Sequence, residues 1–264
     1  MIAFDSIVNA RELGGVKVQD GRRVRYGLLF RTAHLATASE ADIEKLQKMG
    51  IRGVIDFRSE NEAGRMPDKA VPGAWHIQLE VLSLNAHLYK GMNQAFDSST
   101  TFEEGMSNFI MTEAAKMICD GFYISYVDDP DSQAAYARFF RELLSLEGKP
   151  ALWHCTQGKD RTGLAAAFLL FALGADRNTV IEEFAISNIF YARDIAKVKA
   201  VVAHKGGGLD EFNCVDTLVG VTIPGFMDGL DWIDKYYGGM DSYLANQLEL
   251  DGNDIAKLRE YYLD

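Results

Sequence analysis

A loop of ten residues between an apolar strand and an apolar helix constrains this chain more than any other feature of its sequence. Residues 151–153 predict a short buried strand, residues 154–163 form the loop, and residues 164–173 predict an apolar helix. The head of a helix offers unpaired backbone N–H groups and the positive end of the helix dipole, so it attracts anions. The arrangement therefore predicts an anion site between the end of a strand and the start of a helix.

The residue types in this loop are those that phosphate chemistry needs. Cys155 lies at the end of the strand and can act as a nucleophile, and Gly158 lets the loop backbone approach an anion closely. Arg161 adds a planar fork that can bind two oxygens of a phosphate at once. His154 can orient the loop, and the Thr162 hydroxyl can donate to the Cys155 sulfur. The predicted substrate-binding loop is completed by Thr156, Gln157 and Lys159.

We expect two successive displacements at this loop. Cys155 should be a thiolate at neutral pH, because thiols at helix N-termini near cations ionise readily. It would take the phosphoryl group to form a phosphocysteine, which water would then hydrolyse. The charges of Arg161 and Lys159, together with the loop amides, would stabilise the transition state, so we expect neither a metal ion nor a cofactor.

Other interpretations of the loop are weaker. A cysteine after an apolar strand is most often a buried structural thiol, but Gly158 and Arg161 at this spacing favour a reactive one. A nucleotide-binding glycine loop would need Gly at position 153 and Ser or Thr at position 160, where this chain has Trp153 and Asp160. A non-catalytic phosphopeptide-binding module and a sulfur-transfer enzyme with a persulfide on Cys155 stay as rivals, although the complete Cys–Arg pair speaks against the first.

The overall charge limits the partners that we expect. The formal net charge is -11 and the pI is about 5.0, and an acidic surface is repelled by nucleic acids and anionic membranes. A local nest of N–H groups can still hold an anion on an acidic protein, because it acts at short range. We therefore expect a phosphorylated protein or a phosphoinositide as the substrate, with no nucleic-acid partner and no stable membrane insertion.

The cysteines and the apolar segments indicate a reducing compartment. The three cysteines are odd in number and widely spaced, which fits neither a disulfide framework nor a zinc site. The first six residues lack the basic and apolar stretches of a signal peptide, and the longest apolar run, 164–173, is too short to span a bilayer. We expect a cytoplasmic protein, with unconventional secretion left open.

The alternation of strand and helix patterns predicts an α/β fold with a mostly parallel central sheet flanked by helices. Strands are expected at 28–30, 51–57 and 151–153, after a hairpin around Asp20-Gly21. Helices are expected from Ser39 to about 49, from about 132 to 146, directly after the loop, and from Asp176 through Phe190.

A single domain covering 1–264 is expected, with helical additions. The segment of about 82–128 has a helical pattern that is unusually rich in Met and Phe, and a helical C-terminal part begins at about 176. We expect the first addition to form core helices, with a mobile lid over a pocket as the alternative.

Residues 154–163, His-Cys-Thr-Gln-Gly-Lys-Asp-Arg-Thr-Gly, resemble the signature loop of the bacterial atypical tyrosine phosphatases, whose group also includes dual-specificity and phosphoinositide phosphatases. Further family-like strings lie at 9–15, 30–33, 56–60 and 237–244, so the resemblance covers nearly the whole chain. It implies a cysteine-phosphatase-like sheet with extra helices, some forming a lid, and hydrolysis of phosphotyrosine, with phosphoserine or phosphothreonine as further substrates. The family usually has an aromatic residue and Asp where this chain has Ala10 and Glu12.

A phosphoinositide or inositol-phosphate phosphatase with the same mechanism is the alternative. Two cations in the loop, Lys159 and Arg161, suit a substrate that carries more than one phosphate. The acidic surface of the chain would slow its approach to an anionic membrane, so this alternative stays second.

The general acid, which protonates the leaving oxygen and later activates water, is the least constrained residue. Asp160 is the first choice, because it lies inside the loop and the family that this loop resembles has an acidic role there. Asp56 is second, since it ends a predicted parallel strand. Asp128 or Asp129 could instead supply the acid from a mobile loop. Arg58, close to Asp56, is expected in the substrate pocket.

Overall fold

The chain divides into two compact units, each assembled from segments that are distant in the sequence. The computed structural model describes residues 1–81, 99 and 101–264. The first unit comprises the described residues of Met1–Leu82 together with Asp128–Phe184 and Ile233–Asp264. The second comprises the described part of 83–127 together with Ala185–Trp232. The loop 154–163 belongs to the first unit.

Among the described residues, the first unit contains a five-stranded sheet with the strand order β1-β2-β5-β3-β4. The strands are β1 (Arg11–Glu12), β2 (Leu29–Thr32), β3 (Gly53–Asp56), β4 (Trp75–Gln78) and β5 (Ala151–His154). Only β1 is antiparallel to its neighbour, while β2, β5, β3 and β4 pair in parallel. The predicted α/β fold with a mostly parallel sheet is therefore confirmed.

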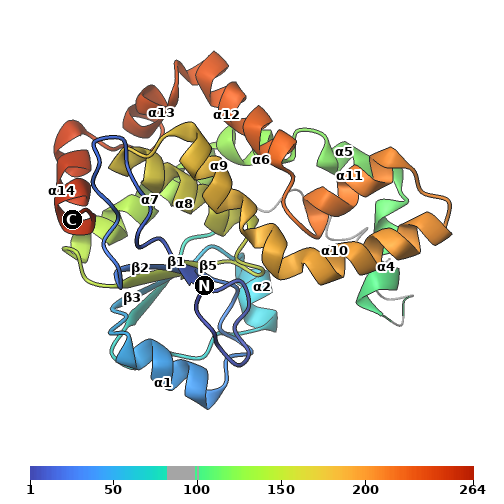
Figure 1. Ribbon diagram of the computed structural model, residues 1–264, viewed down its shortest axis with the longest axis horizontal. Coiled ribbons are helices and arrows are strands. Elements are labelled where there is room, and N and C mark those ends of the chain that lie inside the picture. Colours follow the sequence, from blue (N-terminus) through green and yellow to red (C-terminus); the bar gives the residue numbers. More distant parts are fainter. Residues whose placement is uncertain (82–98, 100) are drawn as a thin grey trace. The chain divides into compact units, whose positions relative to one another are not determined.

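The sheet is covered on both faces, as its sequence pattern indicates. Every residue of β2, β3 and β5 is buried, which is typical of parallel strands with helices on both sides. Helix α1 lies on one face, and α7, α8 and α14 lie on the other (Figure 1). These helices are α1 (Glu40–Lys48), α7 (Pro130–Ser145), α8 (Asp160–Leu173) and α14 (Gly252–Tyr262).

The register of the sheet places the start of the loop. His154, the last residue of β5, lies between Thr32 of β2 and Asp56 of β3. All three residues are at the carboxyl edge of the parallel strands, which is where open α/β sheets place their sites. The loop that follows His154 therefore leaves the sheet at that edge.

Helix α1 begins and ends as the sequence indicates. The Ser39 hydroxyl accepts a hydrogen bond from Asp42 N at 3.0 Å, and the Asp42 carboxylate accepts one from Ser39 N at 3.1 Å, which completes a capping box. Gly50 follows the helix with a φ of 74°, a value that glycine adopts without strain. The expected helix from Ser39 to about 49 is confirmed.

Several elements differ from the expectation. The expected hairpin around Gly21 is reduced to an isolated bridge, Lys17 to Arg23, with backbone hydrogen bonds from Val18 N to Arg22 O and from Val24 N to Val16 O at 2.9 Å. The stretch expected from 176 to 190 is broken at Ile186 into two helices, α9 and α10. Helix α2 and strand β4 were not expected. The bounds of the three helices are α2 Glu60–Arg65, α9 Arg177–Ala185 and α10 Ser187–His204.

The second unit is helical. Its helices include α4 (Phe102–Ile110), α5 (Glu113–Cys119), α6 (Phe122–Val127), α10, α11 (Leu209–Leu218) and the first part of α12 (Ile223–Tyr237). The remaining described helix, α13 (Met240–Asn246), belongs to the first unit. Met106 and Ile110 of α4 are buried in a cluster with Val198, Val202 and Val215.

The helical pattern expected for 82–128 is confirmed where the structure describes it, from 102 to 127. Residues 82–98 and 100 lie outside the described residues, so a lid formed by this segment stays a prediction. In the part of the chain that the structure describes, no helix combines the length and the apolar character needed to cross a membrane.

Candidate active site

The loop after β5 leads into the head of helix α8. Lys159 holds the N-cap position, where no side chain of the described residues makes a capping hydrogen bond. The first N–H groups of a helix need partners, and an anion can supply them. Cys155 follows His154 in this loop and is only 3% exposed. The thiol and the head of the helix therefore lie at the two ends of one short turn.

Each carbonyl group of residues 155–159 accepts a hydrogen bond from a donor outside that stretch. His154 Nδ1 donates to Cys155 O and His34 N donates to Thr156 O, both at 3.2 Å. Asn9 Nδ2 donates to Gln157 O at 3.1 Å and to Gly158 O at 2.9 Å. Arg31 Nη2 donates to Gly158 O at 2.9 Å and to Lys159 O at 3.2 Å. In a trans peptide the C=O and the following N–H point in opposite directions. The N–H groups of 156–160 therefore point away from these donors, as an anion nest requires.

Gly158 lets the loop lie directly against β2. Its φ is 64°, and a Cβ atom built there would lie 2.1 Å from Thr32 O and 2.6 Å from Ala33 N. Both are backbone atoms, so they cannot swing aside as a side chain can. The glycine predicted to allow a close backbone approach therefore does so towards the sheet.

Arg161 turns back along the loop and pairs with Glu62 of α2. Nη1 donates to Glu62 Oε2 and Nη2 donates to Glu62 Oε1, both at 2.8 Å. The Thr156 hydroxyl also donates to Glu62 Oε1, at 2.6 Å, and lies 3.5 Å from Arg161 Nη2. The guanidinium is thus held beside the residue that follows Cys155.

Glu62 is charged at neutral pH. Burial alone would raise the pKa of its carboxyl group, but the hydrogen bonds and charge of Arg161, with the Thr156 hydroxyl, outweigh burial and lower that pKa to about 2. Glu62 also accepts from Ser59 N at 3.0 Å, which closes the capping box of α2. One carboxylate therefore caps a helix and orients the loop arginine.

A buried charge network lies beside the first residue of the loop. Arg58 donates to both oxygens of Asp56 and pairs with Asp68 at 2.8 Å. His154 Nε2 lies 3.0 Å from Asp68 Oδ2, and His154 Nδ1 lies 3.6 Å from Asp56 Oδ1. Burial alone would lower the pKa of His154, but the two carboxylates outweigh it and raise that pKa.

This network has the ligand atoms of a metal site but already contains a cation. Asp56, Asp68 and His154 each offer one ligand atom, and these atoms lie within 4.8 Å of one another. The Arg58 guanidinium bonds to both carboxylates, so it supplies the positive charge that a metal ion would bring. Arg58, which we expected in the substrate pocket, binds these two acids and the carbonyl of Met66 at 2.8 Å, and its contact with a substrate stays a prediction.

The candidate acids lie in different surroundings. Asp160 is in the first turn of α8 and pairs with Lys159 Nζ at 2.9 Å. Asp129 accepts from Ser132 N and is the N-cap of α7, and Asp128 accepts from the Tyr237 hydroxyl at 2.7 Å. Of the expected acids, Asp160 is thus the one that belongs to the loop itself, while Asp129 has the helix-capping role that any loop Asp can take.

Two predicted loop residues have surroundings that the sequence did not indicate. Lys159 is only 2% exposed, although a loop cation was expected to face the substrate. The Thr162 hydroxyl is buried and, among the residues that the structure describes, makes no hydrogen bond. Its donation to the Cys155 sulfur therefore stays a prediction.

The sequence did not single out four residues that hold the loop or its neighbours, namely Asn9, Glu62, Asp68 and Glu183. A signal for one of them was present. Ser59 and Glu62 have the spacing of a capping box, which marks a helix start and fixes the direction of the glutamate. The other three contact the loop region only through the fold.

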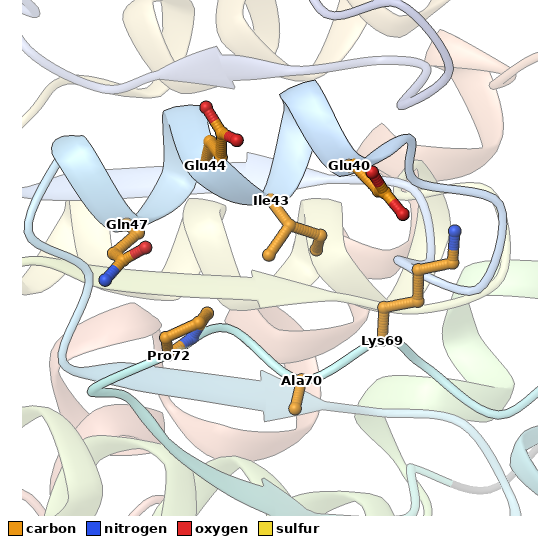
Figure 2. Close-up of a pocket in the computed structure, with 7 residues that line it drawn as sticks. All are labelled: Glu40, Ile43, Glu44, Gln47, Lys69, Ala70 and Pro72. Atoms are coloured by element: carbon orange, nitrogen blue, oxygen red, sulfur yellow. The ribbon is translucent and has the colours of Figure 1, made fainter.

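A separate surface hollow lies between α1 and the segment 69–72. Its described lining includes Ile43 of α1 and, opposite it, Ala70 and Pro72, with Glu40, Glu44, Gln47 and Lys69 at the edges (Figure 2). None of these lining residues belongs to the loop 154–163. The hollow is therefore distinct from the site built around Cys155.

A nucleophilic cysteine, an arginine six residues later and a turn of inward N–H groups at a helix head together define the class of cysteine-dependent phosphatases. A model of the tyrosine phosphatase family matches residues 2–264. A Cupriavidus necator protein named "Putative tyrosine-protein phosphatase" is 35% identical over an alignment of 268 residues, which covers 99% of this chain and 88% of that protein.

Two further proteins are similar to this chain at lower identity. The triple specificity protein phosphatase PtpB of Mycobacterium tuberculosis is 26% identical over 240 residues, covering 84% of this chain and 86% of PtpB. The crystal structure of TpbA from P. aeruginosa is 16% identical, with a TM-score of 0.36, and covers 73% of this chain and 88% of TpbA. From the family match and the Cupriavidus relative, the chain belongs to the tyrosine phosphatase family.

Proposed function

We propose that this enzyme hydrolyses phosphotyrosine in proteins through a phosphocysteine on Cys155, and that phosphoserine and phosphothreonine are further substrates. The observation that carries the proposal is the orientation of the loop peptides. The carbonyl groups of residues 155–159 all accept hydrogen bonds from donors outside this stretch, so the following N–H groups point the opposite way. The family match supports the tyrosine ester. The relative named a triple specificity phosphatase supports a wider range.

The roles follow from the chemistry of each group. Cys155 would attack phosphorus, the loop amides from Thr156 to Asp160 would bind the equatorial oxygens, and Arg161 would bind two of them as charge moves in the transition state. Asp160 would protonate the leaving phenolate and later activate water. Asp56 is a weaker candidate, because its carboxylate already accepts hydrogen bonds from Arg58 N, Nε and Nη2.

A phosphoinositide or inositol phosphate is the second candidate substrate. Lys159 places a second positive charge in the loop next to Arg161, and two cations suit a substrate with more than one phosphate. Its pairing with Asp160 at 2.9 Å neutralises part of that charge, which favours the singly phosphorylated phenol as the main substrate.

We also propose that both compact units form one phosphatase domain and that the enzyme works in the cytoplasm. The family match spans both units, which supports the first point. Cys119, Cys155 and Cys214 are not in disulfides, which supports a reducing compartment.

The test is a substrate panel with three proteins: wild type, Cys155→Ser and the control Cys119→Ser, whose thiol lies outside the loop. Phosphotyrosine, phosphoserine and phosphothreonine peptides and phosphoinositides are compared at equal concentration with a metal chelator present. We expect wild type and Cys119→Ser to hydrolyse phosphotyrosine fastest, and Cys155→Ser to be inactive. Activity that survives in Cys155→Ser, or that disappears with the chelator, would contradict the phosphocysteine mechanism. Faster release of phosphate from phosphoinositides than from phosphotyrosine peptides would make phosphoinositides the main substrate.

A further inference from the structure

Glu183 on α9 is a buried carboxylate that binds two buried arginines at once. Its Oε1 lies 2.7 Å from Arg11 Nε, and its Oε2 lies 2.7 Å from Arg31 Nη1. The side chains of Glu183, Arg11 and Arg31 are 6%, 3% and 0% exposed. A buried ion triad costs desolvation free energy, so its presence is not explained by a gain in stability alone.

One arm of this triad, from Glu183 through Arg31, contacts the loop directly. Arg31 uses Nη1 for Glu183 and Nη2 for the carbonyl groups of Gly158 and Lys159, at 2.9 and 3.2 Å. A planar guanidinium can do both because its donors are fixed relative to one another. The position of Glu183 therefore sets the position of the two carbonyl groups.

The other arm, from Glu183 through Arg11, contacts the loop through the side-chain amide of Asn9. Arg11 donates through Nη1 to Asn9 Oδ1, which turns the Asn9 amide so that Nδ2 faces the loop. That Nδ2 donates to Gln157 O at 3.1 Å and to Gly158 O at 2.9 Å. Both arms thus meet at the carbonyl oxygen of Gly158.

The packing around Glu183 is close. A Cβ atom added at Gly163, in the first turns of α8, would lie 2.5 Å from the ring of Phe184 and 3.2 Å from Arg31 Nη2. The residue after Glu183 is therefore packed against the helix that the loop begins. This contact fixes α9 relative to the loop and limits how far the carboxylate can move.

The charges of the triad do not cancel, since two guanidinium groups face one carboxylate. Burial and the neighbouring Arg11 lower the pKa of Arg31 to about 10, and Glu183 opposes that decrease. Arginine side chains stay charged in proteins, so without the carboxylate the two guanidinium groups would repel one another. Glu183 therefore offsets the repulsion between Arg11 and Arg31.

We propose that Glu183 is a positioning residue of the catalytic loop: through Arg31 and through Arg11 with Asn9, it holds the carbonyl groups of 157–159 outward and so keeps the N–H groups of 158–160 aimed at the phosphate. This inference rests on the proposed function, because it assigns a role within the same site. It extends the site to a helix that starts more than twenty residues after Cys155.

The decisive variant is Arg31→Lys. A lysine keeps the charge that Glu183 needs, but one ammonium group cannot bind Glu183 and both loop carbonyl groups in the geometry of the fork. Glu183→Gln would weaken the contacts through Arg31 and those through Arg11. It would also leave two buried guanidinium groups without a carboxylate partner, so that variant can fail to fold. Arg177→Lys is the matched control, because Arg177 also lies on α9 and pairs with a carboxylate, Asp234, at the surface.

The readouts are inorganic phosphate binding by calorimetry, turnover of an aryl phosphate, and the thermal unfolding midpoint. Binding is measured in a Cys155→Ser background, so it reports on the nest even if the enzyme has no turnover. In folded Arg31→Lys we expect phosphate binding and kcat/KM to fall by about 10- to 100-fold, while Arg177→Lys stays within about twofold of wild type.

Phosphate binding by folded Arg31→Lys decides between this inference and a purely structural triad. A folded Arg31→Lys protein with unchanged phosphate binding and unchanged kcat/KM would overturn it, even if its unfolding midpoint is lower. Failure of the proposed function looks different: wild type would not hydrolyse aryl phosphates, while the dependence of phosphate binding on Arg31 would remain.

Discussion

Glu62 and Arg161 form a two-bond ion pair in which each carboxylate oxygen accepts from one guanidinium nitrogen at 2.8 Å. The same carboxylate closes the capping box of α2 through Ser59 N and accepts from the Thr156 hydroxyl. A residue of a short helix therefore fixes the angle at which Arg161, the proposed catalytic arginine, meets the loop. Loss of that carboxylate should affect turnover more than folding.

The first prediction concerns this pair. In Glu62→Gln the charge that orients Arg161 is lost, so kcat/KM for an aryl phosphate should fall by about 10- to 100-fold, which corresponds to about 1.4 to 2.7 kcal/mol of transition-state stabilisation. Steady-state kinetics measures this. Glu60→Gln is the control, because Glu60 lies in the same first turn but is exposed. Equal rates for the two variants would show that the pair does not orient the arginine.

The second prediction is a pH dependence of stability that arises from His154. Its pKa is raised in the folded protein because, against the effect of burial, Asp68 and Asp56 favour the charged ring. A raised pKa contributes stability that is fully present below the ordinary value of 6.5 and is lost as the pH rises through the folded value. The wild-type advantage over His154→Asn should therefore be largest in mild acid.

Urea unfolding at a series of pH values measures the difference in free energy between wild type and His154→Asn. The exposed His204 provides the control, since His204→Asn should show no such trend. A difference that grows as the pH rises would contradict a charged His154 beside the loop.

The third prediction separates backbone strain from steric clash at Gly158. Gly158→Ala and Gly27→Ala both place a side chain at a positive φ, 64° and 78°, but only the first meets backbone atoms within 4 Å. Gly27→Ala should cost about 1 kcal/mol of unfolding free energy and keep full activity. Gly158→Ala should cost more and lose phosphatase activity, because the loop must leave β2. Chemical denaturation and aryl phosphate turnover check both.

The fourth prediction concerns the proton donor. Asp160→Asn should lower kcat by about 10²- to 10⁴-fold and remove the limb of the pH–rate profile that reports the protonated acid. Asp56→Asn should keep the shape of the profile and lose stability, because Arg58 would lose a buried partner. If Asp56→Asn loses the limb while Asp160→Asn keeps it, the two assignments are exchanged.

The loop could be predicted from the sequence because Cys155, Gly158 and Arg161 are close along the chain and each has a local chemical reason. The parallel sheet could be predicted because strand patterns alternate with helix patterns along the chain. Glu62 could have been predicted too, since its capping box is a local signal. Strand β4 was missed because it has only four residues, Trp75–Gln78, and so short an alternating pattern is a weak signal.

Asn9, Asp68 and Glu183 could not be predicted in the same way. Asn9 is 149 residues from Gly158 along the chain, and Glu183 is 152 residues from Arg31. The contacts of Asn9 and Glu183 arise only because the sheet order places β2 between β1 and β5, and no periodic pattern in the sequence predicts that order. Buried polar residues of this kind meet their hydrogen-bond partners only in the tertiary fold, so the sequence does not distinguish them from other polar residues.

The most direct test of the account is to trap the covalent intermediate. Wild type is mixed with an aryl phosphate, quenched in acid within the first turnover, digested and analysed by mass spectrometry. We predict a phosphate on the peptide that contains Cys155, attached to its sulfur, and none in Cys155→Ser treated in the same way. A phosphate found on another residue, or turnover by Cys155→Ser at the wild-type rate, would contradict a cysteine nucleophile.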